Sequence, residues 1–333
     1  MSRLVFGQRP DGATVERVIL AAHGLRLSVL TMGAIIQDLA VEKAGVARRI
    51  VLGFDTLEPY LGKARYFGCV AGRSANRIRG GELMLDGVTH QLELNENGKT
   101  HLHGGANGFP GKIWRIAAET PESVTLALHS PDGEGGYPGA VDVTCTYRLA
   151  PEQRLVIELE ARTDRTTIVN LATHSYFNLD GGGADILGHR LRIAAEHYTP
   201  VDADLIPTGE IAAVAGTPFD FREPRKVEQG GYDHNFCIAR EPAADPRLAA
   251  RLEGPVSGLA LEVWTTEPGL QFYDGGYLDL PAMPNGASVG AHAGLCLEPQ
   301  RYPDAPHHPH FPSSVLRPGE TYRQVTEYRV FTA

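Results

Sequence analysis

Apolar and polar residues alternate along most of the chain. The clearest runs cover residues 25–30, 141–149 and 155–161, in which every second residue is apolar. A period of two places successive side chains on opposite faces of a strand, so these runs predict strands with one buried face. Turn sequences such as PDG, DGGG, PNG and RPGE lie between the runs, as expected for antiparallel strands joined by short loops.

Helical periodicity is confined to short segments, of which 55–61 (DTLEPYL) and 246–252 (PRLAARL) are the best helix candidates. A barrel or dinucleotide-binding fold would need a long amphipathic helix after most strands. The pattern therefore predicts an all-β protein, a large antiparallel β-sandwich with few short helices. The segments 228–236 (EQGGYDHNF) and 240–246 (REPAADP) are expected to be long loops. Because no linker or internal repeat divides the chain, residues 1–333 are expected to form a single domain.

Composition narrows the class of protein. With 42% hydrophobic and 21% charged residues among 333, the chain has the composition of a soluble globular protein. No run approaches the roughly 20 apolar residues that cross a bilayer, and the first residues do not resemble a secretion signal, so a cytoplasmic protein without a membrane partner is expected. The net charge of -9 and the scattered basic residues argue against nucleic acid as a partner.

Several common chemistries lack their sequence signals. The chain has no G-x-S-x-G elbow, no P-loop and no G-x-G-x-x-G turn. The cluster His307, His308 and His310 is interrupted by prolines and lacks the spacing of metal ligands, which favours an ordered or exposed loop and no metal. The cysteines stand far apart in apolar runs without a CxxC pair, which predicts buried, reduced thiols: Cys69, Cys145, Cys237 and Cys296.

Histidines in two segments are candidates for chemistry. His174 lies in the strand-like run NLATHSYFNL (170–179), where apolar neighbours would shift its pKa across neutrality; a hydrogen-bonded core histidine is the alternative. In the segment THLHGG, a strand would direct His101 and His103 to opposite faces, so one of them is expected to be structural. The glycines after His103 would let a ligand approach, but its local sequence alone favours an exposed hairpin end.

Charged residues in three other runs complete the candidates. Glu298 follows an alternating apolar run, and partial burial would raise its pKa toward that of a general base, although a single Glu at a strand end is usually solvated. Pro299 should end that strand or place it at an edge. Asp233 could act similarly or simply form a turn, and Arg77 could offer its planar fork of donors to hydroxyls or remain a surface residue.

Taken together, six runs resemble the aldose 1-epimerase (galactose mutarotase) family. They are GRSANRI, LHGG, THSYFNL, YDHNF, EPGLQFY and LEPQRYPDAP, in the order and rough spacing of that family. The resemblance covers essentially the whole chain and implies a cofactor-free enzyme that interconverts the α and β anomers of free aldohexoses such as galactose and glucose. It implies His174 as general acid, Glu298 as general base and His103 as a contact near the reacting centre. The positions that would hold the sugar hydroxyls are Asn76, Arg77, Tyr176, Asp233 and Gln271.

The residue types agree with this chemistry. A base must take the proton of the C1 hydroxyl while an acid protonates the ring oxygen, so two groups suffice without a nucleophile or metal. Departures from the family's pattern at Gly276, Pro299 and His307, and at Thr100 or His101, leave the preferred aldose open. The choice between monomer and homodimer is also open. A glycoside hydrolase using Asp233 and Glu298, a hexose-6-phosphate epimerase and a noncatalytic sugar-binding module remain as alternatives.

Overall fold

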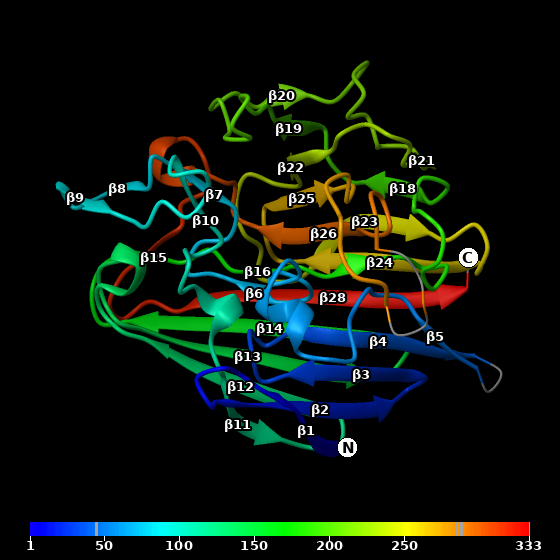
Figure 1. The fold of residues 1–333 in the computed structure, drawn as a ribbon. Helices are drawn as coiled ribbons and strands as arrows, with labels where there is room; N and C mark the ends of the chain where they lie inside the picture. Colours follow the sequence, from blue (N-terminus) through cyan, green and yellow to red (C-terminus); the bar gives the residue numbers. More distant parts are fainter. Residues whose placement is uncertain (44–45, 284–285, 287–288, 333) are drawn as a thin grey trace.

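A nine-stranded antiparallel sheet forms one layer of the fold (Figure 1). The computed structural model describes residues 1–43, 46–283, 286 and 289–332. In spatial order the strands of this sheet are β11 (Arg115–Glu119), β12 (Ser123–Ser130), β13 (Val141–Ala150), β14 (Arg154–Thr163), β28 (Tyr322–Thr332), β24 (Leu259–Thr265), β23 (Arg247–Glu253), β18 (Arg190–Ile193) and β21 (Arg225–Lys226).

Two further antiparallel sheets make up the opposing layer (Figure 1). The five-stranded sheet consists of β1 (Ser2–Gln8), β2 (Thr14–Ala22), β3 (Leu25–Leu30), β4 (Ile36–Lys43) and β5 (Val46–Arg49). The six-stranded sheet has the order β17 (Tyr176–Phe177), β26 (Leu295–Gln300), β25 (Gly269–Tyr273), β22 (Asp233–Cys237), β19 (His197–Thr199) and β20 (Ala212–Ala213).

One hydrophobic cluster joins all three sheets. It contains Leu27 of the five-stranded sheet, Tyr147 of the nine-stranded sheet and Phe272 of the six-stranded sheet. The Tyr147 hydroxyl also donates a 2.6 Å hydrogen bond to the carbonyl oxygen of Ala34, so this buried polar atom is satisfied across the layers. The predicted all-β sandwich is confirmed.

Short strand pairs and 3-10 helices lie outside the three main sheets. The small strand pairs are β7 (Arg77–Arg79) with β10 (Thr100–Leu102), β6 (Val70–Ala71) with β16 (Ala172–Thr173), β8 (Glu82–Leu85) with β9 (Val88–Gln91), and β15 (Thr167–Ile168) with β27 (Val315–Leu316). The 3-10 helices are η1 (Glu58–Leu61), η2 (Phe109–Gly111), η3 (Glu134–Gly136) and η4 (Ala305–His307). Within the described part of the chain, no helix has the length and apolar character needed to cross a membrane.

The strand predictions for 25–30, 141–149 and 155–161 are confirmed by β3, β13 and β14. The helix prediction for 246–252 is wrong, because this segment forms most of β23. Its alanines and leucines are good helix formers, but β23 pairs with β24 and β18 on its two sides, and this tertiary pairing overrides the local preference. In 55–61 only a four-residue 3-10 turn forms.

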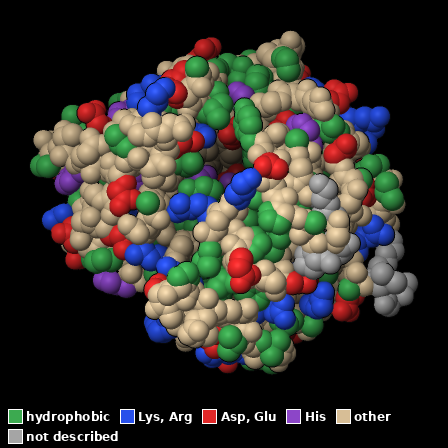
Figure 2. Space-filling view, viewed as in Figure 1, with side chains coloured by type: hydrophobic (Ala, Val, Ile, Leu, Met, Phe, Trp, Pro, Cys, Tyr) green, Lys and Arg blue, Asp and Glu red, His purple; other side chains and the backbone are tan. Residues whose placement is uncertain are grey.

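Two other expectations need correction. The run 170–179 is not one strand: β16 pairs with β6, β17 pairs with β26, and His174 lies in the connection between them. The run 228–236 is only partly a loop, because β22 begins at Asp233. The segment 240–246 is irregular, as expected. Charged side chains of both signs are interspersed over the face shown in Figure 2.

Candidate active site

The six-stranded sheet carries buried polar groups on one of its faces. In β26 the side chains of Leu295 and Leu297 join the hydrophobic core, so Glu298, one position on, points to the opposite face. Across the strands Glu298 lies opposite Gln271 of β25, which lies opposite Asn235 of β22. Strand alternation and register therefore bring together groups that are far apart in the sequence.

This face forms one wall of a 150 Å³ cavity. Every residue expected to belong to the site except Tyr176 lines it: Asn76, Arg77, His103, His174, Asp233, Gln271 and Glu298. Strand β7 supplies Arg77, and the connection before β17 supplies His174. The cavity is thus assembled from separate elements of the sandwich.

His174 and Glu298 face each other inside this cavity. His174 Nε2 lies 3.7 Å from Glu298 Oε1, and the two side chains are only 7% and 3% exposed. Burial lowers the pKa of His174 to about 4. Burial, reinforced by the nearby charge of Asp233, raises the pKa of Glu298 well above its usual value. The second carboxylate oxygen of Glu298 is buried without a hydrogen-bond partner among the described residues, and is thus available to a ligand.

Cys296 is the third polar neighbour of this pair. Its Sγ lies 3.5 Å from His174 Nδ1, and burial keeps the thiol protonated by raising its pKa well above the usual value. Atoms of His174, Cys296 and Glu298 lie within 4.8 Å of one another, which is a compatible donor set for a soft divalent ion. However, a metal ion binds the deprotonated thiolate, and burial keeps the Cys296 thiol protonated. This geometry suits proton transfer better than a metal centre.

His103 is held in one tautomer. Its Nδ1 accepts a 3.2 Å hydrogen bond from the backbone N–H of Asn76, and the backbone N–H of His103 donates to the Asn76 carbonyl oxygen. Burial and the neighbouring His174 and Arg77 lower its pKa well below the usual value. The ring is therefore neutral, with the proton on Nε2 as a hydrogen-bond donor. The expected exposed hairpin end is wrong, because His103 is buried.

His101 is the structural partner predicted for this pair. It is fully buried on the other side of β10, where its Nδ1 contacts the Glu93 carbonyl oxygen at 2.7 Å and its Nε2 contacts the Tyr137 hydroxyl at 2.5 Å. Both ring nitrogens are therefore used inside the protein. Only His103 lines the cavity, in agreement with the prediction that both cannot enter one site, although β10 ends at Leu102 and His103 lies beyond the strand.

Arg77 is clamped rather than exposed. Its Nε and Nη2 each donate a 2.8 Å hydrogen bond to the carboxylate of Glu96, and its Nη1 lies 3.6 Å from Asp233 Oδ2. Glu96 also accepts a 2.7 Å bond from Thr100, and these contacts lower its pKa although burial opposes them. A bidentate pair of this kind fixes the plane of the guanidinium. One edge of Arg77 is thereby directed to Asp233.

Gln271 is oriented by a chain of hydrogen bonds. Its Nε2 donates to Asp233 Oδ1 at 2.7 Å, and its Oε1 accepts from Gln300 at 3.2 Å.

Strand β26 continues through Pro299 to Gln300, and its pairing with β17 covers only the opposite end at Leu295 and Cys296. Pro299 therefore lies where the strand is paired on one side, as expected for an edge.

The comparisons with known proteins agree with this site. The sequence matches the family described as aldose 1-epimerase over residues 16–329. It is 44% identical to the galactose mutarotase of Bos taurus, covering 100% of this chain and 99% of that protein. The chain belongs to the aldose 1-epimerase family. This assignment places it among the isomerases.

Other members extend the comparison. The aldose 1-epimerase of Escherichia coli K12 is 36% identical, with 96% of each chain covered. Among solved structures, the GalM/aldose epimerase homologue from C. elegans superposes with a TM-score of 0.88 at 31% identity, covering 95% of this chain and 99% of that one. The galactose 1-epimerase from Lactobacillus acidophilus gives a TM-score of 0.84 at 28% identity, with 99% and 98% covered.

Tyr176 lies beside the cavity instead of lining it. Its ring stacks on Phe67 at 4.0 Å between centroids and lies 5.1 Å from the His174 ring. It lines a neighbouring 390 Å³ cavity, which shares Tyr273 and Tyr277 with the smaller one. In this epimerase-family chain Tyr176 therefore packs beside the His174 ring, at the boundary between the two cavities.

The sequence motifs do not identify all of the described residues that line the cavity. Tyr273, Tyr277, Leu102 and Leu205 also line it, and Glu96 holds Arg77. Their positions depend on long-range packing, which no local pattern shows.

Of the departures from the family's pattern, His307 contacts Asp304 at 2.7 Å, and the backbone N–H of Gly276 donates to Asp274. None of the cysteines forms a disulfide, and all but the half-buried Cys237 are buried.

Proposed function

We propose that this protein interconverts the α and β anomers of free aldohexoses such as galactose and glucose. The observation that carries the proposal is the buried pair of His174 and Glu298, 3.7 Å apart at the wall of a small polar cavity. The C1 hydroxyl oxygen and the ring oxygen of a pyranose are bonded to the same carbon. An acid and a base that act on them must therefore lie close together, as these groups do.

In the proposed reaction Glu298 removes the proton of the C1 hydroxyl while His174 protonates the ring oxygen. The C1–ring oxygen bond breaks and gives the open-chain aldehyde. Rotation about C1–C2 exposes the other carbonyl face, and closure returns both protons by the reverse transfers. The neutral His103, with its proton on Nε2, is suited to donate a hydrogen bond to the oxygen at the reacting centre. This scheme requires no cofactor.

Burial favours the charge state that ring opening produces. The transfers start from a Glu298 carboxylate and a His174 imidazolium and end with a carboxylic acid and a neutral imidazole. The raised pKa of Glu298 and the lowered pKa of His174 both favour the neutral forms. In the resting site burial therefore favours the neutral pair, and the charged pair that starts ring opening forms when Glu298 passes its proton to His174, 3.7 Å away.

The remaining residues are suited to hold a neutral sugar. Arg77, Asp233 and Gln271 offer donors and acceptors in fixed orientations, and we propose that they bind sugar hydroxyls together with Asn76 and Tyr176. Arg77 is the only cation among the described residues that line the cavity, and its charge faces Glu96 and Asp233. This balance favours a free aldose over a sugar phosphate. We also propose that residues 1–333 act as one domain, since one core joins the sheets.

Polarimetry of freshly dissolved α-D-galactose and α-D-glucose tests this function, in a buffer without phosphate so that the uncatalysed rate stays low. Faster relaxation to an unchanged final rotation is expected with the purified protein. Acceleration only with glucose 6-phosphate would instead support the phosphosugar epimerase. Sugar binding without any acceleration would support the noncatalytic module, and release of reducing sugar from an aryl glycoside would support a hydrolase.

A further inference from the structure

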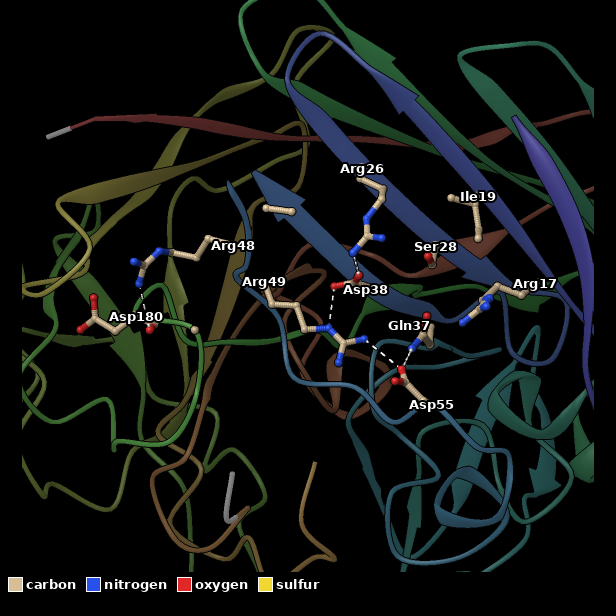
Figure 3. Close-up of a pocket in the computed structure, with 12 residues that line it drawn as sticks. Arg17, Ile19, Arg26, Ser28, Gln37, Asp38, Arg48, Arg49, Asp55 and Asp180 are labelled. Carbon is tan, nitrogen blue, oxygen red and sulfur yellow. Dashed lines mark hydrogen bonds and ion pairs between the residues drawn. The ribbon is translucent and has the colours of Figure 1, made fainter. Parts of the chain in front are cut away.

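A second, larger hollow of 680 Å³ lies on the outer face of the five-stranded sheet (Figure 3). Its lining includes Arg17 of β2, Ser28 of β3 and Asp38 of β4, and shares no residue with the candidate active site. The neighbouring positions Leu27 and Leu39 point into the core, so alternation directs this polar set outward.

Part of the charge in this hollow is already paired. The buried carboxylate of Asp38 accepts hydrogen bonds from Arg26 at 3.1 Å and from Arg49 at 2.8 Å. Asp55 lies 3.3 Å from Arg49 and also accepts a bond from the side-chain amide of Gln37 at 3.1 Å. Figure 3 shows these groups as one connected network. Arg26 and Arg49 are thus balanced by two carboxylates.

Arg17 and Arg48 have no such balance. Among the described residues, Arg17 makes no side-chain hydrogen bond or ion pair, and its Nε is buried without a partner. Its guanidinium instead lies 5.7 Å from the Phe6 ring centroid. Within the described residues Arg48 donates only to the backbone oxygen of Asp180, whose carboxylate accepts from the N–H groups of 256 and 257. The lining therefore carries a surplus of positive charge.

A buried acceptor lies next to this surplus charge. Gln37 is 1% exposed, and its Oε1 has no hydrogen-bond partner among the described residues, although its amide nitrogen is fully used. Ser28 is 4% exposed, its hydroxyl makes no hydrogen bond among the described residues, and its side chain lines the hollow. A buried polar atom such as Gln37 Oε1 rarely lacks a partner unless a ligand or water supplies the missing bond.

Strand register explains why these groups meet. Ser28 lies opposite Ile19 of β2 and opposite Asp38 of β4, which places it beside Arg17 on the same face. The β3–β4 pairing skips Gln37, which is the extra residue of a bulge. Bulges turn a side chain away from its regular direction, and here Gln37 lines the hollow. Figure 3 shows Arg17, Ser28 and Gln37 at one end, with Arg48 toward the other.

We propose that this hollow binds a phosphate group, either as inorganic phosphate or as a phosphate monoester. The guanidinium of Arg17 and the Ser28 hydroxyl would donate to phosphoryl oxygens, which suits the planar fork of arginine. The Gln37 acceptor requires a donor on the ligand. Hydrogen phosphate supplies this donor as its P–OH, and a monoester supplies it through a hydroxyl of its organic part. Sulfate has no donor at neutral pH.

Isothermal titration calorimetry with inorganic phosphate, glycerol 3-phosphate and sulfate tests the proposal. Glycerol phosphate cannot form a pyranose, so its binding is independent of the candidate active site. One saturable site per chain is expected for phosphate or the monoester, with sulfate about tenfold weaker because it leaves Gln37 unpaired. The tighter of the two phosphates identifies the source of the group.

The variants separate the hollow from general charge effects. Arg17→Gln is expected to weaken phosphate binding about tenfold or more, and Ser28→Ala by several-fold. Arg115→Gln removes an exposed arginine of β11 and should leave binding unchanged. Equal affinities for wild type and Arg17→Gln, or no saturable binding to wild type, would overturn the proposal. Thermal unfolding and polarimetry check each fold, and Ser28→Ala decides if Arg17→Gln does not fold.

Discussion

Strand alternation buries apolar side chains in the nine-stranded sheet, whereas in the six-stranded sheet it also buries a group that can transfer protons. In β14 the buried positions Leu155, Ile157 and Leu159 are apolar and pack into the core, while Glu158 and Glu160 lie outside. In β26 all residues are buried, including the carboxyl of Glu298. The first arrangement gains free energy from apolar burial, whereas the second places an ionisable group where burial disfavours its charge. Stability and chemistry should therefore respond separately to mutation.

The largest effect should follow Glu298→Gln, which keeps the shape of the side chain but removes the proposed base. We expect mutarotation of galactose to slow by about 10² to 10⁴-fold. The free energy of unfolding should stay the same or increase, because a buried ionisable group is replaced by a neutral one. Polarimetry and urea unfolding of the same preparation measure both quantities. A fully active variant would remove Glu298 from the mechanism.

The opposite response is expected in the nine-stranded sheet. Leu159→Ala removes an apolar side chain that is 1% exposed and should reduce the free energy of unfolding by about 2–5 kcal/mol. Because Leu159 does not line the cavity, kcat should change less than twofold at temperatures where the variant stays folded. A large loss of kcat in folded Leu159→Ala would show that the two sheets are not functionally separate.

The pH dependence of stability should report the buried histidine. His174 has its pKa lowered from 6.5 to about 4, so the unfolded chain binds a proton at pH 5 that the native protein does not bind. The contribution of His174 to the free energy of unfolding is fully present above about pH 6.5 and is lost as the pH falls toward 4.

Replacing His174 by Gln should therefore reduce the stability difference between pH 7 and pH 5 by about 1–3 kcal/mol. His129→Gln, at an exposed position of β12, serves as the control and should change that difference less. Urea unfolding at both pH values makes the comparison. An unchanged difference in His174→Gln would contradict the assignment of a neutral buried imidazole.

The smallest effect is expected at Glu96, which touches Arg77 and does not line the cavity. Glu96→Gln should weaken the clamp on Arg77 and raise KM by several-fold, since hydrogen bonds to charged groups contribute about 1.5–3 kcal/mol and only one partner is altered. The kcat value should change less, because the proton-transfer pair is intact. Steady-state polarimetry separates these constants, and a fall in kcat without a change in KM would contradict a positioning role.

The same contrast explains what could be predicted from sequence. β13 and β14 were predictable because one buried face imposes strict alternation. β23 was not, since its leucines and alanines also fit a helix and only pairing with β24 decides. In the site, the six sequence motifs identified most of the described cavity-lining residues, including Arg77. Glu96 and Tyr277 were missed because their places depend on contacts between distant segments. Tyr176 lines the neighbouring cavity, and its contact with the sugar stays a prediction.

The proposed function requires that the His174–Glu298 pair opens and closes the sugar ring. Two-dimensional exchange NMR of equilibrated galactose observes this directly, because magnetisation passes between the α and β anomeric protons only when the anomers interconvert. We predict exchange cross-peaks with the wild-type protein, and their loss with Glu298→Gln and with His174→Gln. Cross-peaks of undiminished intensity in both variants would contradict the account.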